Sequence, residues 1–110
     1  GSVGPMIPLM IERGLDVLQS LQPEATGMAP HKLKATYGDR LSFHGGISIQ
    51  RTLPFGSPED IRREVRERIT ALAPGGGYIA CTAHNIQADT PVGNALALLQ
   101  AYHEFGRYAL

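Results

Sequence analysis

The feature that most constrains this fold is the repeated change from a helical pattern to a short apolar stretch. Apolar stretches at residues 15–21, 41–47 and 78–82 each follow a segment with helical features. Each contains apolar residues at adjacent positions, whereas a strand with one face in water alternates apolar and polar residues. Parallel strands also need a crossover between them, which is usually a helix. The sequence therefore predicts an α/β fold in which parallel strands alternate with helices that cover the sheet.

The helix with the clearest signals is expected to begin after Ser57. Ser57 is a typical N-cap residue, and Pro58 suits the first helical position. Glu59 and Asp60 then place negative charge in the first turn, where the helix dipole stabilises it. The glycine-rich segment 74–77 ends the helix. Apolar residues that recur at steps of four and three form its expected buried stripe, which consists of Ile61, Val65, Ile69 and Leu72.

Other helices are expected before and after this one. A helix at residues 5–13 is expected to end at Gly14, because glycine readily takes the left-handed conformation that ends a helix. A short helix at residues 30–37 is expected to end at Gly38. The last helix is expected to have Thr90 as its N-cap and Pro91 at its first position. Its expected buried stripe consists of Leu96, Leu99, Tyr102 and Phe105.

The length of the chain limits how this α/β pattern can close. A barrel of eight strands and eight helices needs about 250 residues. This chain has 110 residues, and 43% of them are hydrophobic and 18% charged, as in an ordinary globular domain. No linker divides it. The chain is therefore expected to be one unit, either a small open three-stranded layer or a fragment of a barrel.

Charge and cysteine content exclude several functional classes. Ten basic and ten acidic residues cancel, so no net charge draws the chain to nucleic acid or to an anionic membrane. A single cysteine excludes an internal disulfide and is typical of a reducing compartment. No apolar run approaches the roughly 18 residues of a membrane-spanning helix. We therefore expect a cytoplasmic protein without nucleic-acid or membrane partners.

Polar residues follow the apolar stretch 78–82, at the end of its expected strand, and α/β proteins place ligands and catalytic groups at such ends. His84 is the leading catalytic candidate, because an imidazole with a pKa of about 6.5 can donate or accept a proton near neutral pH. Alternatively, His84 hydrogen-bonds to the loop backbone and shapes the entry to the last helix. Asn85 and Gln87 are candidate ligand contacts in the same loop, and Asp89 is a candidate helix cap.

Residues of the second strand could contribute to the same site. Gln50 and Arg51 follow this strand and could reach the same mouth as His84, and a guanidinium suits a carboxylate ligand. The alternative for Arg51 is a solvated loop side chain. His44 lies within the strand and is expected in the core or behind the site. Cys81 and His84 are potential zinc ligands, although a buried structural thiol is the commoner role of such a cysteine.

Several of these residues belong to motifs found together in one family. The motifs read GDRL at residues 38–41, GGISIQ at 45–50, LPFGSPE at 53–59 and AHNIQ at 83–87. With them, the chain resembles the C-terminal part of the uroporphyrinogen decarboxylase superfamily, whose fold is a TIM barrel. The resemblance implies that residues 1–110 are a fragment with the last three strand and helix units of such a barrel. In many relatives an Asp is expected where this chain has Ser48.

The resemblance implies that the parent enzyme decarboxylates tetrapyrrole carboxylates without a cofactor. In that family a His at the strand end that matches His84 contacts the tetrapyrrole substrate. The N-terminal residues that bind and protonate the pyrrole have no counterparts in this chain, which is therefore expected to be inactive alone. The candidate substrate-binding residues are Gln87, Gln50, Arg51 and Asn85.

Two other functions are compatible with the resemblance. Related corrinoid-dependent methyltransferases have a zinc-binding Cys at the place of His84, so His84 and Cys81 could hold zinc beside a corrinoid-linked substrate. The chain could instead be a non-catalytic half-barrel that serves as an assembly module. A barrel fragment exposes unpaired backbone groups on its outer strands. We therefore expect a homo-oligomer that forms through the exposed barrel edges.

Overall fold

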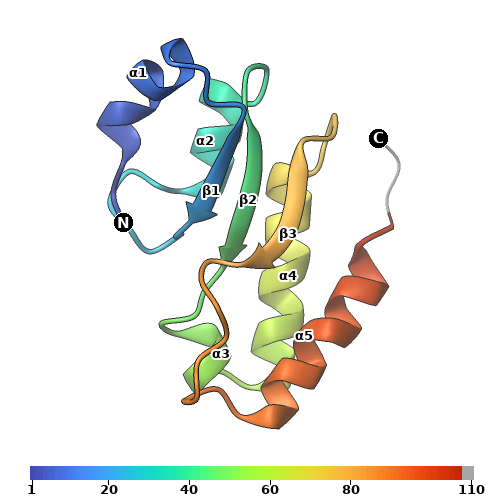
Figure 1. Ribbon diagram of the computed structural model, residues 1–110. Helices are drawn as coiled ribbons and strands as arrows, with labels where there is room; N and C mark the ends of the chain where they lie inside the picture. Colours follow the sequence, from blue (N-terminus) through green and yellow to red (C-terminus); the bar gives the residue numbers. More distant parts are fainter. Residues whose placement is uncertain (108–110) are drawn as a thin grey trace.

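The computed structural model describes residues 1–107, and the last three residues of the 1–110 segment lie outside the described residues. Strands and helices alternate along the chain (Figure 1), as predicted. The elements in chain order are a 3-10 turn η1 (Gly4–Met6), α1 (Ile7–Glu12), β1 (Val17–Leu21), α2 (Pro30–Tyr37), β2 (Ser42–Ile47), α3 (Thr52–Phe55), α4 (Pro58–Leu72), β3 (Tyr78–Thr82) and α5 (Val92–Phe105).

The three strands form one parallel sheet in the order β1-β2-β3, and the helices lie behind one of its faces (Figure 1). Leu18 of β1 and Phe43 of β2 are in register and are buried under the helices. Val17 and Ile79, by contrast, are 39% and 52% exposed. The predicted α/β arrangement, part of a TIM barrel, is confirmed. The expectation that helices cover the sheet holds for one face only, because the open face corresponds to the inside of a closed barrel.

Two hydrophobic clusters join the sheet to its helices. The first consists of Ile7, Leu18, Leu21, Met28, Leu33, Leu41, Phe43 and Leu72. The second consists of Ile47, Leu53, Ile61, Val65, Ile69, Ala73, Leu98 and Ala101. Tyr78 packs against both clusters. Buried Asn94 of α5 adds a polar link, because its Nδ2 donates hydrogen bonds to the carbonyls of Leu53 (2.8 Å) and Gly56 (2.9 Å). Together these contacts hold α3, α4 and α5 in fixed positions beside the end of β2.

Helix α4 forms as its sequence predicts. The backbone N–H of Asp60 donates to the Ser57 hydroxyl (3.1 Å), and the Ser57 N–H donates to the Asp60 carboxylate (2.8 Å). This reciprocal capping box satisfies two donors at the helix start, and the bond from the Ser57 backbone is the main cause of the lowered pKa of Asp60. The predicted stripe is confirmed, since all four of its apolar residues are buried.

Helix α5 differs from its sequence-based prediction. Pro91, not Thr90, is the N-cap residue, and no side chain caps the helix. Leu96 and Leu99 are each 56% exposed, so their prediction as core residues is wrong. The residues that α5 buries are Asn94, Leu98 and Ala101, with Tyr102 and Phe105 half-buried. The reason is that α5 is apolar on more than one side, and only its contact with α3 and α4 selects the buried side. No helix among residues 1–107 is long and apolar enough to cross a membrane.

The backbone conformation at the carboxyl end of β2 requires glycine at position 45. Gly45 has a φ of 127°, a conformation that residues with a side chain rarely adopt. A Cβ atom added to Gly45 would lie 2.8 Å from the backbone nitrogen of Leu21, so β1 approaches β2 too closely for any side chain. The pairing of β1 with β2 shifts register at this place, between Gln19 and Leu21. The absent side chain thus lets the two strands converge at their carboxyl ends.

We predict that Gly45→Ala lowers the free energy of unfolding by about 2 kcal/mol or more, because it combines a strained backbone with a steric clash. The matched control is Gly93→Ala in α5, where an added Cβ meets no atom within 4 Å. This control should be neutral or stabilising by up to about 1 kcal/mol, since alanine favours a helix. Urea unfolding followed by circular dichroism measures both. Equal effects of the two substitutions would contradict the proposed strand contact.

Candidate functional site

A cavity lies on the open face of the sheet, at the carboxyl ends of the strands. All three strands end at the same edge (Figure 1), and the cavity has a volume of about 460 Å³. Leu18 and Phe43 face the helices, so their chain neighbours Gln19 and His44 face the opposite, open side. The cavity is lined by residues of all three strands and of the loop after β3, namely Gln19, Ser20, His44, Cys81, Thr82, Ala83, His84 and Asn85.

His84 lies at the rim of this cavity with an exposed side chain. The preceding residue, Ala83, is buried, and its N–H donates to the Ile47 carbonyl (2.9 Å), which extends the pairing of β3 with β2. The Thr82 hydroxyl donates to the His84 carbonyl. The backbone of His84 is therefore held by the sheet, while its imidazole makes no hydrogen bond within residues 1–107. The ring is free to contact a ligand, and Asn85 lies beside it at the same cavity.

His44, like Gln19, Ser20 and Thr82, lines the cavity but was not predicted as a site residue from the sequence. It was expected in the core or behind the site, but it is half-buried on β2 and lines the same cavity as His84. It is in register with Gln19 of β1 and with Ile79 of β3, so it occupies the middle of a row across the open face. Side chains alternate along a strand, so the sequence places Phe43 and His44 on opposite faces of the sheet. It does not say which of the two faces the helices cover, so the open position of His44 could not be predicted.

Cys81 also lines the cavity, and its thiol is hydrogen-bonded to the backbone. The thiol donates to the Thr82 carbonyl (3.2 Å), and burial raises its pKa, which favours the protonated form over the thiolate that zinc needs. Within residues 1–107, no group of three or more His, Cys, Asp or Glu side chains could hold a metal ion. Cys81 and His84 thus supply two of the four ligands of a tetrahedral zinc site.

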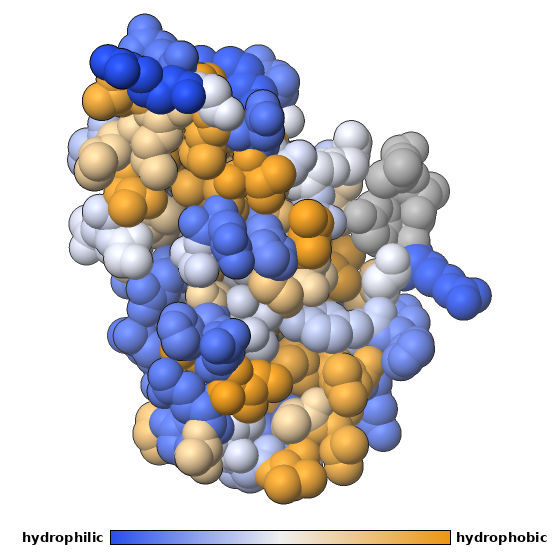
Figure 2. All heavy atoms as spheres, in the orientation of Figure 1, coloured by the Kyte–Doolittle hydropathy of each residue, from blue (hydrophilic) through white to orange (hydrophobic). Residues whose placement is uncertain are grey.

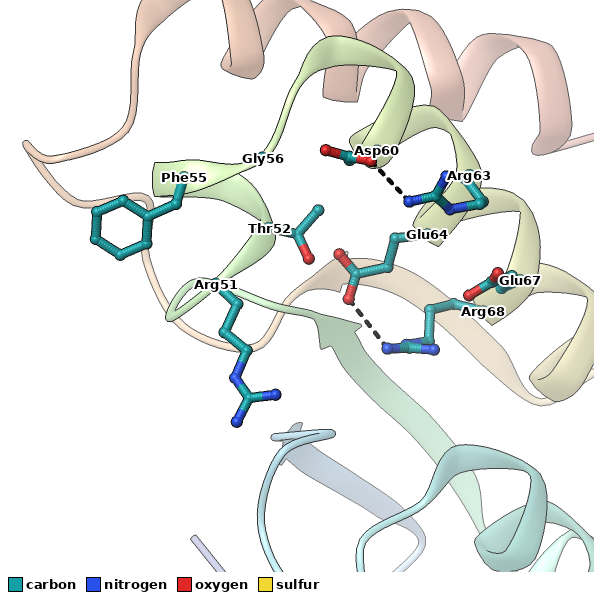
Figure 3. A pocket seen from close by; sticks show the side chains of 9 residues that line it. All are labelled: Arg51, Thr52, Phe55, Gly56, Asp60, Arg63, Glu64, Glu67 and Arg68. Atoms are coloured by element: carbon teal, nitrogen blue, oxygen red, sulfur yellow. Dashed lines mark hydrogen bonds and ion pairs between the residues drawn. The ribbon is translucent and has the colours of Figure 1, made fainter.

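The structure separates the other predicted site residues from this cavity. Gln50 and Gln87 are exposed and do not line it. Arg51 instead borders a second hollow of about 420 Å³ between α3 and α4 (Figure 3). The expectation that Arg51 shares one mouth with His84 is therefore not met. This second hollow is lined by Arg51, Thr52, Phe55, Gly56, Asp60, Arg63, Glu64, Glu67 and Arg68.

A buried polar network lies beside the second hollow, at the end of β2. Ser48 is only 3% exposed, and its N–H donates to Glu64 Oε1 (3.1 Å) while its hydroxyl bonds to Glu24. The Ser48 hydroxyl also accepts a hydrogen bond from the Arg51 N–H (3.1 Å). Arg68 pairs with Glu64 Oε1 at 3.0 Å (Figure 3) and donates from Nε to the Gly46 carbonyl (2.8 Å). The network therefore holds the backbone from β2 to α3 at several points.

We predict that Glu64→Gln lowers the free energy of unfolding by about 2 to 3 kcal/mol, because it leaves the guanidinium of Arg68 without its counter-charge in a largely buried place. The control is Glu67→Gln, an identical change at an exposed position of α4 that should stay within about 0.5 kcal/mol. Urea denaturation of both variants is the measurement. If their midpoints are equal, the ion pair does not stabilise the turn after β2.

The geometry defines a class of protein, namely an α/β segment of a parallel barrel with a polar cavity at the carboxyl ends of its strands. The sequence model of one family, described as Uroporphyrinogen decarboxylase (URO-D), matches residues 2–105. This match covers most of the chain and contains every residue that lines either hollow. The chain therefore belongs to the uroporphyrinogen decarboxylase family, as its motifs predicted.

Curated relatives carry the same family name. The uroporphyrinogen decarboxylase of Psychromonas ingrahamii is 31% identical over 71 residues, which are 64% of this chain and 20% of that protein. That of Actinobacillus succinogenes is 28% identical over 74 residues, or 67% of this chain and 20% of that protein. That of Alkalilimnicola ehrlichii is 31% identical over 67 residues, or 61% and 18%. The chain spans about a fifth of the length of these relatives, so it corresponds to a fragment of them.

Proposed function

We propose that this segment forms part of the substrate site of a uroporphyrinogen decarboxylase-like enzyme, which removes carboxyl groups from a tetrapyrrole. We also propose that the segment is inactive without the rest of the barrel. The observation that carries the first proposal is the cavity at the strand ends, where His84 lies with an unbonded imidazole in a chain of this family. The single cysteine supports a cytoplasmic location for the enzyme.

In this proposal His84 binds and orients the substrate. Its backbone is anchored through Thr82 and through the extended pairing at Ala83, so the ring is presented from a rigid strand end. An imidazole can donate a hydrogen bond to a carboxylate or accept one from a pyrrole N–H. Near neutral pH it can also donate a proton to the carbon that loses its carboxyl group as carbon dioxide. Asn85 would add an amide contact from the same rim. No cofactor is required for this chemistry.

Residues outside the cavity remain proposed substrate contacts. Gln50 and Gln87 are exposed near the strand ends, and Arg51 faces the neighbouring hollow between α3 and α4. A tetrapyrrole is a wide ring system with carboxylates around its rim, so contacts beyond one cavity are expected. Arg51 would supply a guanidinium for one of these carboxylates. The buried network at Ser48 supports this role, because it fixes the backbone N–H of Arg51.

A second candidate function is zinc-dependent methyl transfer to or from a corrinoid-linked substrate. It is supported by Cys81 and His84, which line one cavity, but the two side chains leave a tetrahedral site incomplete. Native mass spectrometry of the full-length protein with added zinc separates the two functions. Zinc that is retained by the wild type and lost in Cys81→Ser would favour methyl transfer. Full decarboxylase activity after removal of all metal would favour the first proposal.

We predict that His84→Ala in the full-length protein lowers turnover by about 100-fold or more, as expected for loss of a group that exchanges a proton. His103→Ala is the control, because His103 is exposed on α5 and lines neither cavity. Release of carbon dioxide from a uroporphyrinogen substrate measures both variants. Unchanged turnover in His84→Ala, with the control also unchanged, would reject the role of His84.

The isolated segment is proposed to associate with copies of itself. β1 and β3 are the edges of the described sheet, and Val17, Ile79, Leu96 and Leu99 are exposed apolar residues. Such edges and faces favour further strand pairing and burial. A stable assembly without decarboxylase activity would also support the alternative of a non-catalytic half-barrel module.

We predict that light scattering of the isolated segment at micromolar concentration gives a mass of two or more times the 11.8 kDa chain mass. The substitution Ile79→Lys places a charge on the open face and should reduce the assembly, whereas Thr70→Lys on the exposed side of α4 should leave it unchanged. A monomeric mass for the unmodified chain would contradict the proposed association.

A further inference from the structure

The cavity at the strand ends carries free hydrogen-bond donors and no acid. None of its lining residues is Asp or Glu. Cys81 and Thr82 already donate to backbone carbonyls. By contrast, the side chains with N–H donors make no hydrogen bond within residues 1–107. These side chains are Gln19, His44, His84 and Asn85. A cavity with several unused donors and no negative charge suits an anionic oxygen group.

His44 has the most constrained position among these donors. It lies on the central strand, and β1 and β3 flank it on both sides. It is half-buried, so a hydrogen bond that it makes is less weakened by water than one at an exposed site. His44 therefore offers a rigid donor at the floor of the cavity, whereas His84 lies at the rim.

The row that contains His44 is polar at one end and apolar at the other. Gln19 lies on one side of His44 in register, and half-exposed Ile79 lies on the other. Figure 2 shows that the corresponding face of the molecule mixes hydrophilic and hydrophobic side chains and is not uniformly apolar. A ligand that matches this row has an apolar body with a carboxylate at its edge, since the body can cover Ile79 while the carboxylate accepts from His44.

We propose that His44 is a direct ligand contact, which donates an N–H hydrogen bond to a carboxylate of the substrate at the floor of the cavity. The inference rests on the proposed function, because it names a further residue of the same site. His44 binds the carboxylate at the edge of the ligand, and Ile79 contacts the apolar body of the ligand. His44 is thus a specificity-determining residue for carboxylate-bearing rings.

The test uses the full-length protein and two probes, namely uroporphyrin and the same porphyrin with its carboxylates converted to primary amides. Dissociation constants are measured by fluorescence for the wild type, His44→Leu, His44→Gln and the control His31→Leu, which changes an exposed residue of α2. His44→Leu should weaken uroporphyrin binding by about 10- to 100-fold, as expected for a lost hydrogen bond to a charged group. It should weaken the binding of the amide probe less, because a hydrogen bond to a neutral amide oxygen is weaker than one to a carboxylate.

The His44→Gln variant keeps an N–H donor and should retain most of the affinity for uroporphyrin. The unfolding midpoint of each variant is measured in parallel, and His44→Gln serves as the test if His44→Leu does not fold. Unchanged uroporphyrin binding by His44→Leu, or equal weakening of both probes, overturns the role of His44 alone. If the wild type binds neither probe, the proposed function fails, and the inference about His44 fails with it.

Discussion

The pairing of β2 with both of its neighbours is the constraint on which the rest of the structure depends. β2 is the central strand, and the register of β1 and β3 is defined against it. Two contacts hold its carboxyl end. Gly45 allows close approach to β1, and Arg68 bridges the Gly46 carbonyl and Glu64. Since both hollows lie beside this strand end, a change at β2 would move His44 and Arg51 together.

The sheet has one face packed against helices and one open face. This asymmetry explains why the hydrophobic core and the polar cavity lie on opposite faces of the sheet. The helices bury Leu18, Phe43 and Ile47 behind the sheet, and these residues need no other partner. On the open face, Gln19 and His44 have no helix above them. In a closed barrel this face would point to the barrel interior, and the strand ends would form its mouth. The polar cavity is therefore a feature of the barrel architecture that a three-stranded segment already displays.

The sequence predicted features whose causes are local. The capping box at Ser57 and the stripe of α4 depend on residues within a few positions of one another, and both are present. The strands and their parallel direction followed from apolar stretches joined by helices. The position of His84 and Asn85 at a strand end, where they line a cavity, also followed from their place after an apolar stretch. By contrast, the buried side of α5 and the separation of Arg51 from His84 were not predicted, since both depend on how distant elements pack.

The sequence by itself determined the α/β class, the helix start at Ser57, the family and the loop that carries His84. These properties arise from short-range periodicity, capping and motifs, which act through neighbouring residues. Only the tertiary structure decided that His44 faces the same cavity as His84, and that Ser48, Glu64 and Arg68 meet at the end of β2. The physical reason is that strand register and the choice of covered face depend on contacts between segments far apart in the chain, which alternation along one strand cannot specify.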